Sequence, residues 1–187
     1  MNTSKIRTLL NLMMTFVLLM LMSYTLLGAR AHEWLGIGMV GLCLAHHAMN
    51  WRWHKNLIRG NYSAWRVLQV AINGLILLAI VGLLGSGMVM SLYVFRFLDI
   101  QMGAAEARSI HMFCSYWAFV LMSVHIGFHG NQICGRLRKG TAVLGKMAET
   151  WLPRVIIAGL AVYGIYSFYT RDMAGYLLMQ NEFAFFD

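Results

Sequence analysis

The chain has 187 residues, of which 59% are hydrophobic and only 12% are charged. Soluble domains carry about 25% charged residues, so this composition excludes an ordinary soluble domain and indicates one integral membrane bundle. The net charge of +8 does not indicate a nucleic-acid partner, because the basic residues lie in short segments between apolar runs rather than on one soluble face.

The first apolar segment covers residues 6–28 and follows Lys5 and Arg7. A small-x-small sequence at 29–31 leaves cleavage of a signal peptide as the alternative. The apolar run is long for a signal peptide, so we expect a retained membrane helix. The second segment covers residues 32–53 and ends in a basic, tryptophan-rich stretch typical of a membrane boundary.

Three more spans are expected, at 66 to about 95, at 109–130 and at 151–169. Glycines in the second half of the third segment would allow close helix packing or clearance for a flat cofactor; they are Gly82, Gly85 and Gly87. Residues 171–187 are too short and too polar to span. The sequence therefore predicts an all-α bundle of five transmembrane helices over residues 1–170, with an external amphipathic tail over 171–187.

The basic residues are distributed unevenly between the two sides of five such spans. Of the 15 basic residues, one side receives eleven, namely Lys5, Arg7, Arg52, Lys55, Arg59, Arg66, Arg136, Arg138, Lys139, Lys146 and Arg154, and the other receives Arg30, Arg96, Arg108 and Arg171. Cytoplasmic loops are enriched in lysine and arginine, so we expect a cytoplasmic N-terminus and an external C-terminus. Cleavage after the first segment would leave four spans in the same orientation.

Four histidines share one spacing on the second and fourth segments. His32 and His46 lie fourteen residues apart, as do His111 and His125. Fourteen residues of helix rise about 21 Å and return to within about 40° of the same face. Because one span separates the two segments, they run in the same direction, and the histidines match in depth. Paired neutral imidazoles in an apolar bundle are what a bis-histidine haem requires, so a four-helix core is expected to bind two haems.

The inner pair is ambiguous, because His47 follows His46 and His129 lies one turn beyond His125. Zinc and di-iron sites are less suitable, since no carboxylate lies inside a span. The cysteines, Cys43, Cys114 and Cys134, form no CxxC or CxxCH pattern, which argues against covalent haem attachment.

Two further groups of residues are candidates for cofactor contacts. Arg30 and Arg108 flank the outer histidines and could pair with haem propionates, although a role as membrane anchors explains them equally well. A second group could frame a quinone head group at the opposite end of the bundle; it consists of Asn50, Trp51, His54 and Gln69.

These residues together resemble the flavinylation-associated cytochrome family over most of residues 8–130. The resemblance is carried by His-Glu-Trp-Leu-Gly at 32–36, His46, Asn-Trp-Arg-Trp at 50–53, Ser86-Gly87, His111, Trp117 and the His125-x-x-x-His129 pair. The family is similar in layout to the b-type cytochrome subunits of hydrogenases and formate dehydrogenases. The resemblance implies a prokaryotic inner-membrane cytochrome with two haem b, ligated by His32, His46, His111 and His125.

The function expected from the residues and the resemblance is electron transfer between the quinone pool and an external flavin- or iron-sulfur-bearing partner. Such a protein would be a subunit of an oxidoreductase complex rather than a self-sufficient enzyme. A transmembrane ferric or oxygen reductase subunit would use the same haems without a quinone. A histidine-lined metal permease would bind metal without haem, and a plain membrane anchor would not depend on its histidines.

Overall fold

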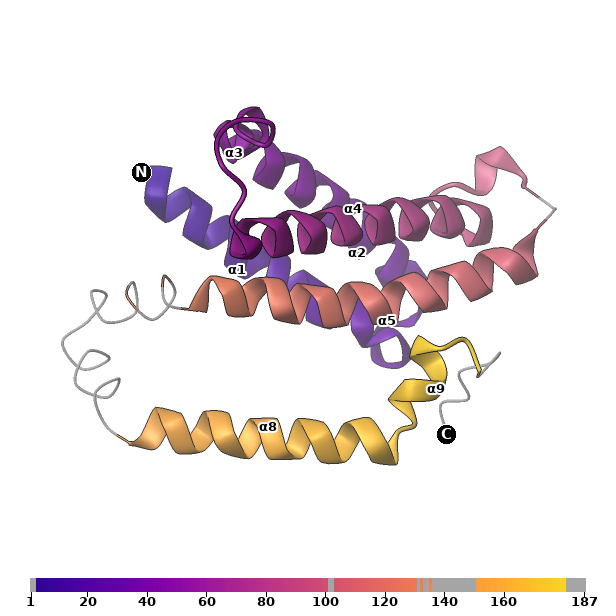
Figure 1. The fold of residues 1–187 in the computed structure, drawn as a ribbon. Coiled ribbons are helices and arrows are strands. Elements are labelled where there is room, and N and C mark those ends of the chain that lie inside the picture. The colour runs from indigo at the N-terminus through magenta and orange to yellow at the C-terminus, as the bar shows by residue number, and fades with distance from the viewer. Residues whose placement is uncertain (1–2, 101–102, 131, 133–134, 136–150, 181–187) are drawn as a thin grey trace.

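The computed structural model describes residues 3–100, 103–130, 132, 135 and 151–180, and all regular structure in these ranges is helical (Figure 1). The predicted all-α class is confirmed. Within these ranges, three helices are long and apolar enough to cross a membrane: α1 (Thr3–Met22), α4 (Ala64–Met90) and α5 (Ala104–Phe128). Cys134, the basic loop at 136–146 and the end of the tail at 181–187 lie outside the described residues.

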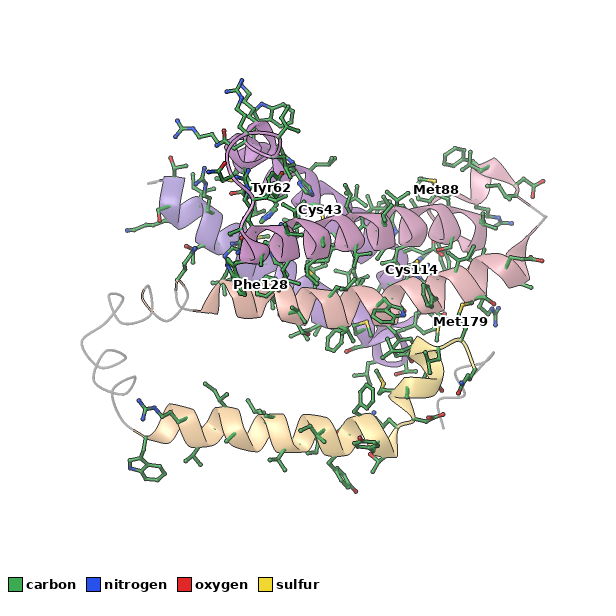
Figure 2. All side chains as sticks on the ribbon, in the orientation of Figure 1. Cys43, Tyr62, Met88, Cys114, Phe128 and Met179 are labelled. Carbon is green, nitrogen blue, oxygen red and sulfur yellow. The ribbon has the colours of Figure 1, made fainter. Side chains whose placement is uncertain are left out.

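The core consists of two helical hairpins. Helix α1 packs against α2 (Tyr24–Met49), and α4 packs against α5 (Figure 1). The hairpins meet where Leu10 and Met14 of α1, Cys43 of α2 and Ile80 of α4 lie together. In the seam between α4 and α5, a Cβ added to Gly82 would lie only 2.6 Å from the Cys114 sulfur (Figure 2). Glycine therefore permits the close approach of these two helices.

Both ends of the predicted second segment differ from the sequence expectation. Gly28 has φ +74°, a conformation that favours glycine, and it kinks α2 so that the straight part of the helix begins before His32. At the other end, the Asn50 amide donates to the His46 carbonyl at 2.8 Å and the helix stops at Met49. The continuation expected to residue 53 is a separate short helix, α3 (Trp51–Lys55).

The third predicted segment also ends early, at Met90 instead of about residue 95. The Glu33 carboxylate of α2 accepts hydrogen bonds from the Ser91 hydroxyl and from three successive backbone N–H groups, those of Leu92, Tyr93 and Val94. These distances lie between 2.6 and 3.0 Å. Consecutive N–H groups around one carboxylate form an anion nest, and it holds the chain out of helical conformation before η1 (Arg96–Leu98).

Replacing Glu33 by alanine should loosen the junction between α2 and this loop. Hydrogen bonds to a charged acceptor stabilise by about 1.5–3 kcal/mol each, but water replaces part of the loss at an exposed loop, so we expect a total of about 2 kcal/mol. Thermal unfolding of the purified protein in detergent measures the loss. Glu106→Ala, which removes an exposed carboxylate from the first turn of α5, is the matched control. Equal melting temperatures of the two variants would contradict a structural role for the nest.

Helix α8 (Leu152–Thr170) lies apart from the two hairpins and is connected to them through α9 (Met173–Leu177) (Figure 1). Its large apolar side chains are exposed around most of the helix (Figure 2). A helix that is apolar on all sides is suited to lipid or to another subunit rather than to water. Its apolar stretch, Arg154–Thr170, is shorter than those of the three span-length helices.

The start of the predicted tail packs on the bundle itself. Tyr176 of α9 stacks on Tyr116 of α5 with ring centres 4.9 Å apart. The Trp117 indole N–H donates to the Leu177 carbonyl at 3.0 Å. Residues 173–177 therefore pack against the middle of α5, around Tyr116 and Trp117.

Candidate functional site

The outer pair of predicted ligands, His32 of α2 and His111 of α5, lies side by side. Their ring centres are 6.0 Å apart and the ring planes are inclined by 63°. Two imidazole nitrogens that share one metal, each about 2 Å from it, place the ring centres roughly 6 Å apart. The spacing would let these two imidazoles hold a single iron between them.

Neighbouring groups set the tautomer of His111. The Ser86 hydroxyl of α4 donates its single proton to the Gly82 carbonyl, 2.6 Å away. The same oxygen lies 3.0 Å from Nδ1 of His111, and it can only accept there. Nδ1 therefore carries the proton in the neutral ring, and the Nε2 lone pair is left for a metal. Metal-ligating histidines are oriented in this way by a hydrogen bond from the other ring nitrogen.

His32 has no such serine. Its Nδ1 is buried, and no group in the described part of the chain makes a well-formed hydrogen bond to it. The backbone carbonyl of Leu21 in α1 approaches the same ring, and the Tyr24 ring packs on it edge-on at 5.2 Å.

Gly87 leaves space beside His111. A Cβ at this position would touch the imidazole, 3.6 Å from its Cε1, and at Gly85 a Cβ would meet no atom within 4 Å. Gly87 therefore lies beside the His111 ring, and clearance for a flat cofactor stays a prediction.

The inner histidines repeat the arrangement with asparagines. Nδ1 of His46 lies 3.2 Å from Oδ1 of Asn11 in α1. Nδ1 of His125 lies 2.8 Å from Oδ1 of Asn73 in α4. An amide oxygen accepts only, so Nδ1 of each ring is the protonated nitrogen and Nε2 is available. Each of these contacts joins the two helices of one hairpin, and the pairing of His46 with His125 across the hairpins stays a prediction.

The two alternates differ in their surroundings. The His47 ring lies 5.8 Å from that of His46, and its Nδ1 lies 3.0 Å from Nε2 of His54 in α3. The structure therefore favours His46 over His47 as a ligand. The His129 ring lies 5.0 Å from that of His125 and also interacts with His46, so it stays an alternate to His125.

The arginines predicted near the outer pair lie at that end of the bundle. The Arg30 guanidinium lies over the Tyr93 ring, 5.2 Å from its centre. Arg108 is exposed on α5, one turn before His111. At the other end, the Trp51 ring lies 5.9 Å from that of His54, while the Asn50 amide is used to end α2. The predicted quinone-framing group is therefore only partly assembled around a common point.

Sequence reasoning missed the amides that orient the inner histidines. Asn11 and Asn73 are the signal that could have identified them, because an amide inside an apolar span is unfavourable without a hydrogen-bonding partner. Each asparagine lies on the helix that forms a hairpin with the helix of its histidine.

No group of three or more histidine, cysteine or carboxylate side chains that could hold a metal ion occurs among the described residues. A bis-histidine haem needs only two protein ligands for each iron, so it does not require such a group. Comparisons with known protein families, with curated proteins and with solved structures found no match to this chain.

Proposed function

We propose that this protein is a membrane b-type cytochrome that binds two haems without covalent attachment and passes electrons across the membrane. His32 and His111 hold the outer haem, and His46 and His125 hold the inner one. The observation that supports the proposal most is the outer pair, whose ring centres are 6.0 Å apart. The hydrogen bond that His111 Nδ1–H donates to the Ser86 hydroxyl oxygen adds to it, because it leaves Nε2 of His111 free for iron.

The protein positions the imidazole ligands and provides the apolar environment around them. Ser86, Asn11 and Asn73 fix the orientation of three imidazoles and increase their basicity as ligands. The apolar helices around them exclude water and lower the local dielectric constant. The histidines lie at two levels about 21 Å apart along the helices, so an electron would cross the membrane in two transfers.

Haem with two imidazole ligands cycles between ferric and ferrous states and offers no open position to a substrate. We therefore infer an electron-transfer subunit of an oxidoreductase complex rather than a self-sufficient enzyme. The proposed exchange is with the quinone pool at one end and with an external flavin- or iron-sulfur-bearing protein at the other.

The proposed setting is a prokaryotic inner membrane with five spans, in which α2 and α8 join the three span-length helices. The excess of basic residues on the side of the membrane that holds the N-terminus supports a cytoplasmic N-terminus and an external C-terminus. The exposed apolar surface of the helices supports contact with lipid.

Quinol-driven reduction tests this function directly. Purified protein in liposomes, supplied with a reduced quinone, should develop a ferrous b-type absorption band that a quinone-site inhibitor prevents. Dithionite should produce the same band in full, which gives the reference. If dithionite reduces the haem and quinol does not, the protein would be a transmembrane reductase subunit that receives its electrons from another donor. A protein that binds metal ions and shows no Soret band would be a permease.

Replacing Asn73 by leucine should change the inner haem without removing it. Loss of the hydrogen bond to Nδ1 weakens the donor strength of His125, which destabilises the ferric state. We expect the midpoint potential of the inner haem to rise by tens of millivolts, at about 59 mV for each tenfold change in a one-electron equilibrium. Redox titration measures the shift. Asn61→Leu, in an exposed loop, is the control, and an unchanged potential in Asn73→Leu would exclude the positioning role.

A further inference from the structure

A pocket lies at the N-terminal end of α1, away from the histidine pairs. Its volume is about 470 Å³, and its walls are the first turns of α1 and the end of α2 with the start of α3. The lining residues are Thr3, Ser4, Arg7, Ala48, Met49, Trp51 and Arg52. Two guanidinium groups, two hydroxyl-bearing side chains and one indole thus surround a single space.

The charge in this pocket is of one sign. Arg7 is held at the wall by a hydrogen bond from its Nη2 to the Met49 carbonyl, at 2.7 Å. This bond leaves the other guanidinium N–H groups available to a ligand. Among the described residues, no carboxylate lines the pocket. The nearest carboxylate along the chain, Glu33, is bound in the nest near the opposite end of α2.

We propose that this pocket binds a phosphate group, either of an anionic phospholipid head group or of a soluble phosphate compound. Planar guanidinium groups recognise phosphate oxygens through paired, charge-assisted hydrogen bonds. The first N–H groups of α1 add partial positive charge at the same place. The ligand is thus an oxyanion rather than an uncharged quinone.

The position of the pocket suits a lipid. Trp51 is exposed at its edge, and tryptophan is enriched at the level of the head groups. Anionic lipids are attracted to clustered basic residues at the membrane surface. Lys5 and Lys55 lie close in sequence to the two arginines and add to the local field without lining the pocket.

The test compares two pocket variants with two controls that remove equal charge. The pocket variants are Arg7→Gln and Arg52→Gln, alone and together; the controls are Lys5→Gln and Arg59→Gln. In one arm, full-length protein is placed in phosphatidylcholine nanodiscs containing a minor fraction of phosphatidylglycerol, and native mass spectrometry counts the retained phosphatidylglycerol. In the other arm, inorganic phosphate is titrated onto the protein in neutral detergent and the thermal shift is followed.

The wild type and both controls should retain phosphatidylglycerol, and each pocket substitution should weaken its binding about tenfold. The same loss confined to the inorganic phosphate arm would assign the pocket to a soluble phosphate. Pocket variants that bind as the controls do in both arms would overturn the site. Arg7→Gln also removes the hydrogen bond that joins α1 to the end of α2, so a loss of binding in that variant could come from a change of packing. Arg52→Gln leaves this bond intact, so its effect on binding reports on the pocket itself. Neither readout involves haem, so failure here would leave the proposed cytochrome function untouched.

Discussion

His111→Ala should lower the haem content of the purified protein from about two to about one per chain. The Ser86 hydroxyl holds the imidazole at this position through its Nδ1, which leaves Nε2 as the ligand that the substitution removes. His32→Ala should have the same effect, because the two rings face one another across 6.0 Å. Haem per protein, measured with the absorption spectrum, gives the result.

Two controls separate loss of a ligand from loss of fold. His54→Ala removes a histidine outside both pairs and should keep the full haem content. His111→Gly with added imidazole should recover the low-spin spectrum, because the free base can occupy the space left by the side chain. Full haem content in both His32→Ala and His111→Ala would reject the outer ligand assignment.

His46→Ala should remove the inner haem, whereas His47→Ala should retain it. The two histidines are adjacent, but Nδ1 of His46 is held by an amide oxygen of another helix, while His47 pairs with His54. Because metal affinity falls by about 10–100-fold when such orienting contacts are lost, the correctly held ring is the expected ligand. Separate titration of the inner and outer haems in each variant measures the difference.

The pair His125→Ala and His129→Ala extends this test to α5. His125 has the amide contact, to Asn73, and its loss should remove the inner haem. His129→Ala should keep this haem, with at most a shifted potential. The reverse result, in which His129 or His47 is indispensable and its neighbour is not, would show that the amide contacts do not mark the ligands.

The sequence was sufficient to predict the helical class and the region of each helix, because runs of apolar residues and basic boundaries are strong signals. Helix ends were less predictable. The early end of α4 depends on Glu33, a residue far away in the chain whose carboxylate binds the N–H groups of the loop. A pattern within one segment cannot contain a long-range contact of this kind.

The candidate site, too, could be predicted from the sequence only in part. The fourteen-residue spacing of His32 with His46 and of His111 with His125 predicts depth along a helix, and the structure brings His32 and His111 together at the outer level. The pairing of His46 with His125 stays a prediction. The choice of His46 over its neighbour was left open, because it depends on Asn11 of another helix. Side-chain partners across helices become visible only when the packing is known.

The packing of α9 on α5 was also outside the reach of the sequence. Residues 171–187 were predicted only to form an external amphipathic tail, and within it the Tyr176 ring stacks on Tyr116. Period and composition identify amphipathic segments without saying which surface they cover.

The most direct measurement is a pyridine haemochrome assay on the purified, folded protein. Two parallel helices that carry imidazoles at matching levels should yield haem b, at about two per chain, extractable without breaking a covalent bond. A folded sample that is colourless and stays colourless after haem is supplied would contradict the cytochrome function.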